Sequence, residues 1–334
     1  MELEKIRRLV SLSKFDVCHE KCSFDPLRLV YVSKAGSRRV NLFKTLISSS
    51  CTFDCKYCGN AWRKGVKATP LEIYRAFKFL KERGFVSGAF ISNAITEPER
   101  SMEEILEAGE LIRREKPSYL HLKIVPGATR DQIKRAVEIA NRVSVNIETP
   151  SKSILSEICG VKTKEDLLRR LRWGLKAAKK LGKSFTTQMI VGIGESDEKV
   201  LKVSEKLYKS GVKRVYYSRF VPVKETPMEK RPAEKKERVA NLYRADALLR
   251  IYGYSFRDFK EVLVDGFLPK EDPKMLIALK KEKLEPLEVP GAGKKIASLI
   301  QEGFSLAEIK RMGYSVKRLS AFINQRRLHE FSTE

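Results

Sequence analysis

Short apolar stretches alternate with longer amphipathic stretches through the middle of the chain. Each apolar stretch is bounded by polar residues, which is the pattern of a buried strand. The predicted strands are Leu42–Ile47, Ala89–Ser92, Tyr119–Ile124, Val143–Ile147, Thr186–Val191 and Arg214–Phe220. Because helical patterns separate them, the alternation predicts parallel βαβ units.

The amphipathic stretches predict helices, and several of them begin at recognisable capping residues. Thr69 and Pro70 suit the N-cap and the first helical position. Ser101 with Glu104, and Thr129 with Gln132, have the spacing of capping boxes. The predicted helices run from Thr69 to about Arg83 and over Ser101–Arg114, Thr129–Asn141, Thr163–Leu181 and Asp197–Lys209.

The last third of the chain has a different pattern. A charged, proline-containing segment, 224–238, predicts a surface connection to a helix over Arg238–Tyr252. Further on, the turn Pro290-Gly-Ala-Gly293 precedes a helical stretch that begins near Lys294 and Lys295. Backbone N–H groups at such a helix start form an anion site, suited to a nucleic-acid phosphate. The alternative is a plain turn into a surface helix.

This last third also contains a proline and a capping box that bear on its helices. Pro286 makes the helix before the turn look short, whereas Ser305 and Glu308 form another capping box. A final helix is predicted over Ser315–Arg326.

Composition adds a strong positive charge. The 334 residues carry 67 Lys and Arg against 42 Asp and Glu, a net charge of +25. This imbalance favours a polyanionic partner, nucleic acid first. A surface rich in Lys and Glu would explain the charged fraction of 33% but not its sign. We expect a cytoplasmic protein without a membrane span, because no long apolar stretch and no signal-peptide core is seen.

One loop carries the clearest chemistry, the sequence Cys51-Thr-Phe-Asp-Cys55-Lys-Tyr-Cys58. A cubane iron–sulfur cluster usually takes four thiolates, and this loop supplies three, so one iron keeps an open position. Zinc is disfavoured because no Cys or His lies between Cys58 and His121. A disulfide is disfavoured in a cytoplasmic chain.

The loop and its strand–helix context resemble the radical S-adenosylmethionine (SAM) superfamily. The resemblance implies an α/β fold, a partial (β/α)6 TIM-like barrel whose C-terminal strand ends build the site. It also implies two cofactors, a [4Fe–4S] cluster and SAM. In that superfamily the open iron chelates SAM, and an electron from the cluster cleaves it to methionine and a 5′-deoxyadenosyl radical, which abstracts a hydrogen atom from the substrate.

Motifs across nearly the whole chain resemble a narrower family, the DNA modification/repair radical SAM proteins with a C-terminal helix-hairpin-helix. The matching stretches are 14–17, 51–58, 120–128, 143–150, 187–192, 213–218 and 243–253. This resemblance implies a nucleic-acid substrate, with DNA favoured over RNA. It also implies an electron donor such as ferredoxin or flavodoxin, and a uracil-DNA glycosylase-like partner. The alternatives are an RNA- or tRNA-modifying enzyme and a nucleic-acid-binding Fe–S protein without turnover.

The resemblance assigns roles by position. Cys51, Cys55 and Cys58 are the expected cluster ligands, and Tyr57 is expected to pack against the adenine of SAM. Ser92 and Asn93 stand where the superfamily usually has Gly-Gly-Glu, so backbone contacts are expected there. The other expected SAM contacts are Asn146 and Glu148, which share a strand face, and Gln188; the expected nucleic-acid contacts are Gly291, Gly293, Lys294 and Lys295.

For several other residues, both a functional and a structural role are consistent with the sequence. His121, with Lys123 on the same strand face, is either a ligand of substrate or SAM, or a core histidine. Arg219 shares a face with Tyr217 and is a candidate for holding a phosphate. Cys18, Cys22 and Cys159 form a second cluster or a redox-active thiol, or are free cysteines. The predicted domains are an extension over 1–42, the barrel over 43–225, a helical connection over 226–283 and a helix-hairpin-helix-like domain over 284–334.

Overall fold

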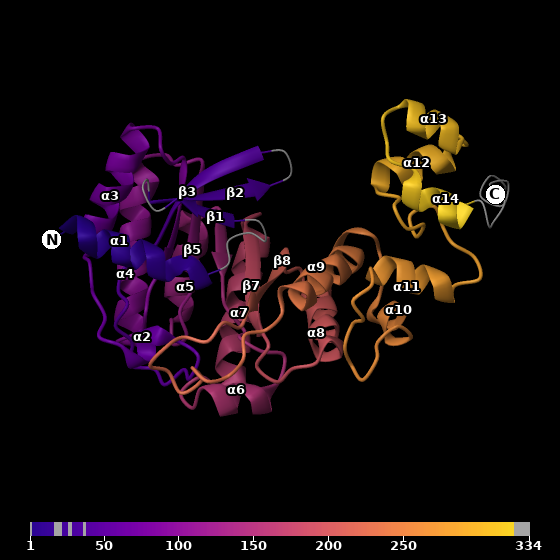
Figure 1. The fold of residues 1–334 in the computed structure, drawn as a ribbon. Helices are drawn as coiled ribbons and strands as arrows, with labels where there is room; N and C mark the ends of the chain where they lie inside the picture. The colour runs from indigo at the N-terminus through magenta and orange to yellow at the C-terminus, as the bar shows by residue number, and fades with distance from the viewer. Residues whose placement is uncertain (1, 17–21, 26–28, 36–37, 324–334) are drawn as a thin grey trace. The chain divides into compact units, whose positions relative to one another are not determined.

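The computed structural model describes residues 2–16, 22–25, 29–35 and 38–323. The chain divides into two compact units (Figure 1). The barrel unit comprises residues 1–195 and 207–234, and the C-terminal unit comprises residues 196–206 and 235–334. Each unit is described by itself below.

A curled sheet of eight strands, ordered β1 to β8 as in the sequence, forms the barrel unit (Figure 1). The strands β1, β2 and β3 are antiparallel neighbours, and β3 to β8 are all parallel. Their bounds are Cys22–Asp25, Val30–Ala35, Arg38–Leu46, Gly88–Ser92, Tyr119–Lys123, Arg142–Ser144, Ser184–Val191 and Arg214–Arg219. The six parallel strands confirm the expected α/β half-barrel.

Two of the six predicted strands differ from the prediction by more than two residues at one end. β3 begins at Arg38 rather than Leu42, because its first half pairs with β2, which the sequence analysis did not predict. β6 ends at Ser144 instead of reaching Ile147. Beyond it the N–H groups of Ile147 and Glu148 both donate to the Gln188 carbonyl, and Glu148 has a φ of +62°. This irregular backbone ends the regular ladder.

Helices connect successive parallel strands. Between β3 and β8 these are α2 (Gly59–Trp62), α3 (Pro70–Glu82), α4 (Pro98–Arg114), α5 (Arg130–Ile139), α6 (Lys152–Ile158), α7 (Lys164–Lys180) and α8 (Asp197–Lys209), whereas α1 (Glu2–Leu12) and the 3₁₀ turn η1 (Ser13–Phe15) precede β1. Thr69 is the N-cap of α3 as predicted, and it also forms a capping box with Glu72; Thr129 makes the predicted capping box with Gln132. The predicted cap at Ser101 is wrong: Pro98 starts α4 one turn earlier, and the buried Ser101 hydroxyl accepts from the Thr96 N–H instead.

Apolar side chains fill the space between the sheet and these helices. Every residue of β4 is buried, as expected of a parallel strand covered on both faces. Close packing is required at Gly109 of α4, where an added Cβ would lie 2.9 Å from the Leu122 side chain. This rigid core fixes the ends of the parallel strands in space.

The segment α1–η1, which the sequence analysis left unassigned, is tied to the sheet by polar contacts. Ser13 Oγ donates to the Lys44 carbonyl at 3.0 Å, and Lys44 Nζ donates to the Asp16 carbonyl at 2.8 Å. Gln188 Nε2 donates to the Phe15 carbonyl at 3.1 Å. These contacts to β3 and β7 hold residues 13–16 against the sheet.

The C-terminal unit is helical. Its helices besides the start of α8 are α9 (Lys236–Ile251), α10 (Phe256–Lys260), α11 (Pro273–Lys280), α12 (Lys294–Gln301), α13 (Leu306–Arg311) and α14 (Lys317–Ile323). α11 ends well before Pro286, and Ser305 caps α13 with Glu308 as predicted. An apolar cluster joins α11, α12, α13 and α14: Ala278, Leu284, Val289, Ala292, Ile296, Ala297, Ile300, Ile309, Leu319 and Ile323.

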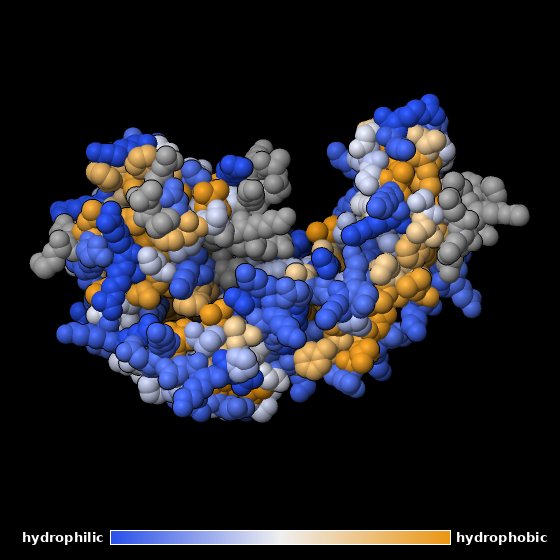
Figure 2. Space-filling model, in the orientation of Figure 1, coloured by the Kyte–Doolittle hydropathy of each residue, from blue (hydrophilic) through white to orange (hydrophobic). Residues whose placement is uncertain are grey.

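The surface is largely polar. Figure 2 shows hydrophilic residues over much of the visible face of the barrel unit. Among the described residues, the structure contains no helix with the length and apolar character needed to span a membrane.

Candidate active site and cofactor site

A cavity of about 490 Å³ lies at the carboxyl ends of the parallel strands in the barrel unit. Its lining includes strand ends such as Leu46, Ser92, Lys123 and Arg219, together with the loop of residues 51–58, hereafter the cluster loop. All the residues that the sequence analysis assigned to the cluster and to SAM line this one cavity: Cys51, Cys55, Cys58, Tyr57, Ser92, Asn93, Asn146, Glu148 and Gln188.

The cluster loop is fixed from two sides. The Thr52 N–H donates to the Ile95 carbonyl at 2.8 Å, which ties the loop to the segment after β4. The Lys56 N–H donates to the Ile158 carbonyl at 2.9 Å, which ties it to the end of α6. Cys55 is buried, whereas Cys51 and Cys58 are partly exposed. The loop therefore presents its cysteines to the cavity from a supported backbone.

The thiols of the loop differ in acidity. A hydrogen bond with Cys159, aided by the charge of Lys162, outweighs burial and lowers the pKa of Cys55 to about 6. Burial raises the pKa of Cys58 to about 11. A nearby cation favours the thiolate form, which is the form that binds metal.

This donor set fits an iron–sulfur cluster better than a single metal ion. Within the described ranges, no three His, Cys, Asp or Glu side chains converge closely enough to hold one ion. The cysteines of a cubane bind different irons, so their sulfur atoms stand apart. Cys51, Cys55 and Cys58 would hold the cluster, and soft thiolates are the ligands such clusters take.

A buried ion pair stands beside the loop. Lys162 Nζ donates to Glu148 Oε1 at 2.7 Å and to the Tyr57 hydroxyl at 3.2 Å, and the side chains of Lys162 and Glu148 are only 9% and 8% exposed. Burial opposes both charges, but Lys162 keeps the pKa of Glu148 below its usual value. Cys55 and Glu148 likewise raise the pKa of Lys162 despite its burial. Both groups are therefore charged at neutral pH.

Two of the expected SAM contacts are used by the protein itself. Asn93 accepts from the Ser48 N–H at 2.8 Å and donates to the Ser101 carbonyl and to Glu104. Its side chain is thereby engaged, which leaves the backbone for a ligand, as the sequence analysis expected. Gln188 binds the Phe15 carbonyl, so its amide holds η1 in place.

His121 lies in the core. It is 1% exposed, stacks on Phe90 with ring centroids 4.0 Å apart, and its Nε2 bonds to Ser144 Oγ at 2.9 Å. Burial and the nearby cations hold its pKa well below the usual value, so it is neutral. By contrast, its strand neighbour Lys123 lines the cavity and pairs with Asp16.

Arg219 and Tyr217 also differ in their access to the cavity. Arg219 lines the cavity, and its Nη1 donates to the Glu234 carbonyl at 3.0 Å. Tyr217 is buried, with 2% exposed. Of the pair, Arg219 therefore has access to a bound molecule.

Sequence reasoning missed most of the basic residues that line the cavity: Arg8, Lys14, Arg63, Lys64, Lys162 and Lys224. Arg8 and Lys14 come from α1–η1, whose buried Ile6, Leu9 and Val10 have helical spacing that was visible in the sequence. Arg63, Lys64, Lys162 and Lys224 lie in irregular segments without such a signal.

The remaining cysteines are only partly described. Cys159 is fully buried, and its Sγ lies 3.4 Å from Cys55 Sγ. Cys18 and the side chain of Cys22 lie outside the described residues. A second cluster therefore stays a prediction.

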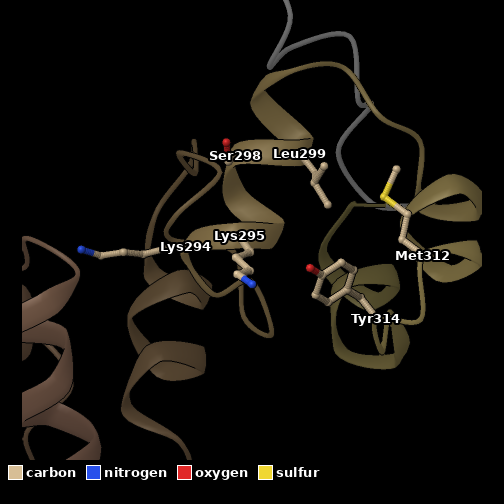
Figure 3. A pocket seen from close by; sticks show the side chains of 6 residues that line it. All are labelled: Lys294, Lys295, Ser298, Leu299, Met312 and Tyr314. Carbon is tan, nitrogen blue, oxygen red and sulfur yellow. The ribbon is translucent and has the colours of Figure 1, made fainter. Parts of the chain in front are cut away.

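The predicted nucleic-acid contacts lie in the C-terminal unit, at the start of α12. Gly293 is the N-cap, and no side chain caps the helix. Lys294 and Lys295 are exposed and line an open pocket of about 520 Å³ with Ser298, Leu299, Met312 and Tyr314. In Figure 3, Lys294 points away from the apolar side chains of this pocket.

The two glycines of the turn differ. Gly291 has a φ of +92°, and an added Cβ would lie 2.9 Å from Arg318 Cβ. Gly293 has an ordinary φ of −84°, and an added Cβ would meet nothing closer than 3.8 Å. The turn conformation therefore requires glycine at 291 but not at 293.

Known proteins resemble this chain in sequence. Residues 45–207 match the model of the radical SAM superfamily. Among curated proteins, the biotin synthase of Acetivibrio thermocellus is 28% identical over 208 residues, 59% of this chain and 62% of that protein. The biotin synthase of Leptospira biflexa is 27% identical over 206 residues, 58% and 56% of the two chains. The chain thus spans about 60% of the length of these relatives.

Solved structures support the same fold. The FeFe-hydrogenase maturase HydG from Carboxydothermus hydrogenoformans aligns with a TM-score of 0.52 at 16% identity, over 70% of this chain and 55% of that one. The structural match shows the fold, whereas the family match over residues 45–207 and the curated relatives indicate an enzyme. The chain contains a radical SAM domain, and its cofactors are a [4Fe–4S] cluster and SAM.

Proposed function

We propose that this enzyme reductively cleaves SAM to modify or repair a nucleic acid, with DNA as the first candidate. The observation that carries the proposal is the cavity, which joins three cysteines to an excess of cationic side chains. Its lining has eight Lys or Arg residues and two acids, Asp16 and Glu148.

The residues around the cysteines suit SAM. When bound, the cluster supplies the electron that cleaves SAM to methionine and a 5′-deoxyadenosyl radical. Lys162 and Glu148 offer a buried cation and anion to the carboxylate and amino groups of the methionyl part. Tyr57 offers its ring to the adenine, and Asn146 lies at the strand end where the ribose is expected.

The charge of the cavity argues for an anionic substrate. Lys162 and Lys123 pair with the two acids, and Arg63 pairs with Glu225 outside the lining. Five lining cations are left over among the described ion pairs. SAM carries a sulfonium cation, so its binding does not neutralise this excess. Phosphate groups do, and Arg219 and Lys14 are placed to contact them.

The C-terminal unit supports the same proposal. The uncapped N-terminus of α12, with Lys294 and Lys295 beside it, provides backbone N–H groups and charge for a phosphate. Such contacts hold a nucleic acid without reading its sequence. A helix-hairpin-helix role for this turn, and partners such as ferredoxin, flavodoxin or a uracil-DNA glycosylase-like protein, belong to the proposal.

Nucleic acid should stimulate SAM cleavage. Anaerobically reconstituted protein would be reduced and assayed for 5′-deoxyadenosine alone, with duplex DNA, with single-stranded DNA and with tRNA. We expect the highest rate with DNA. Stimulation by tRNA alone would assign the enzyme to RNA, and no stimulation by any of them would contradict the proposal.

A second candidate is a small-molecule enzyme related in activity to biotin synthase. It is favoured by the identity of 28% over 59% of the chain. A cavity of about 490 Å³ is also within the range of small-molecule sites. Stimulation of 5′-deoxyadenosine formation by an added sulfur-free precursor of biotin, without nucleic acid, would support this candidate.

A further inference from the structure

Cys159 lies against the cluster loop although it belongs to a distant part of the chain. It follows α6 and is fully buried, and its Sγ is 3.4 Å from Sγ of Cys55. This is hydrogen-bond distance for two sulfur atoms. Cys55 is a cluster ligand, so Cys159 is a thiol in direct contact with the sulfur that binds iron.

Asp54 fixes Cys159 in this position. Its Oδ2 accepts from the Gly160 N–H at 2.8 Å, and its Oδ1 accepts from the Val161 N–H at 3.2 Å. The Cys159 thiol reaches Oδ1 at 3.0 Å. Gly160 permits this approach, since an added Cβ would lie 2.8 Å from Oδ2.

Several contacts therefore hold Cys159 close to Cys55. On the other side of Cys55, the Lys56 N–H donates a hydrogen bond to the Ile158 carbonyl. The residues on both sides of Cys55, Asp54 and Lys56, are thus hydrogen-bonded to the segment that contains Cys159. The cluster loop and residues 158–161 form one polar unit within an otherwise apolar cluster.

Binding of the cluster decides which of the two thiols, Cys55 or Cys159, can donate the hydrogen bond between them. A ligating Cys55 has no proton, so its sulfur only accepts. Cys159 still carries one S–H, which lies within reach of two acceptors, Cys55 Sγ and Asp54 Oδ1. A hydrogen bond to a ligating sulfur withdraws electron density from the cluster and favours its reduced form.

We propose that Cys159 is a positioning residue that donates an S–H hydrogen bond to the iron-bound sulfur of Cys55 and thereby raises the reduction potential of the cluster. Asp54 orients the thiol and competes for its proton, which limits this effect. Cys159 is then neither a cluster ligand nor part of a second cluster. The inference rests on the cluster and not on the identity of the substrate.

The test compares Cys159→Ala, Cys159→Ser and wild type after anaerobic reconstitution. Iron content and an EPR-monitored redox titration would be measured for each. We expect equal iron in all three, a more negative potential in Cys159→Ala, and a potential near that of wild type in Cys159→Ser, because the hydroxyl restores a donor. The control Ile158→Val trims the adjacent buried side chain without touching a polar group, and its potential should match wild type.

Two results would overturn the proposal. Equal reduction potentials in Cys159→Ala and wild type would show that Cys159 does not tune the cluster through a hydrogen bond. Loss of iron in both Cys159 variants would make Cys159 a ligand. Should Cys159→Ala fail to fold, proton ENDOR on the reduced wild-type cluster in H₂O and D₂O decides: an exchangeable proton coupled to the cluster is expected, and its absence contradicts the donor role.

Discussion

The barrel cavity and the turn before α12 are both candidate binding regions, but they are built in different ways. The cavity collects residues from strand ends throughout the sheet and from α1–η1, and a buried ion pair and buried thiols lie beside it. The turn uses consecutive residues, an uncapped helix start and two exposed lysines. Chemistry needs convergent groups held by a core, whereas a phosphate contact needs only backbone N–H groups and charge.

The largest effect is expected from the cluster ligands. Replacing Cys51, Cys55 and Cys58 together by Ala removes every thiolate of the cluster loop. Iron content should fall from about four per chain to background. Lys294→Glu, at the exposed turn, should keep its iron. Iron retained in the triple variant would place the cluster elsewhere in the chain.

Breaking the buried ion pair should destabilise the barrel unit. Glu148→Gln leaves Lys162 buried without its carboxylate and should cost about 3–5 kcal/mol in the free energy of unfolding, measured with urea on the cluster-free protein. The matched control is Glu165→Gln, which breaks an exposed pair with Lys152 and should cost about 0–1 kcal/mol. Equal costs would show that the buried pair has no special role.

The same pair predicts an acid dependence. The pKa of Glu148 in the folded protein is below its usual 4.5, because the charges of Lys162 and Lys123 overcome burial. Its contribution is therefore complete above pH 4.5 and is lost as the pH falls through the lower folded value. In urea unfolding at a series of pH values, Glu148→Gln should lose less stability than wild type on acidification. Parallel curves would contradict the assignment.

Charge reversal separates the two regions in nucleic-acid binding. One double variant is Lys14→Glu with Lys64→Glu, at the cavity, and the other is Lys294→Glu with Lys295→Glu, at the turn. Each loss of two phosphate contacts should reduce the salt slope of duplex DNA affinity by about 2, as measured by anisotropy.

Only the cavity variant should also reduce the stimulation of SAM cleavage at saturating DNA. An unchanged salt slope in the turn variant would remove α12 from the proposed interface. An unchanged slope in the cavity variant would remove Lys14 and Lys64 from it.

The smallest effect is expected within the turn itself. Gly293→Ala fits the backbone and should leave the free energy of unfolding within about 0.5 kcal/mol of wild type while weakening DNA binding a few-fold, because its methyl group stands in the way of a phosphate. Gly291→Ala should cost about 1 kcal/mol or more, since its φ is positive and the added Cβ meets Arg318. A loss of stability in Gly293→Ala would contradict the prediction that alanine fits this backbone. Weaker DNA binding by that variant would then say nothing about phosphate contact.

Local signals explain what the sequence could predict. The strands are short apolar runs, Thr69 and Thr129 cap their helices, and the spacing of the three cysteines identifies the cluster loop. The cap at Ser101 failed because Pro98 is the stronger start signal. Each of these features depends on residues that are near one another in the chain.

Long-range contacts explain what the sequence could not predict. Cys159 meets Cys55 because the end of α6 lies against the cluster loop, and Lys162 meets Glu148 from the other side of α6. Residues 13–16 meet the sheet through Lys44 and Gln188. Nothing in the spacing of these residues marks them as partners.

Hydrogen transfer from nucleic acid tests the central claim most directly. The reduced, reconstituted enzyme would be incubated with SAM and with DNA whose nucleosides carry deuterium at their carbon positions, and the 5′-deoxyadenosine formed would be analysed by mass spectrometry. The account predicts deuterium in 5′-deoxyadenosine, because in the proposed function a nucleotide enters the cavity beside the radical formed from SAM. Product that contains no deuterium from either labelled DNA or labelled RNA would contradict it.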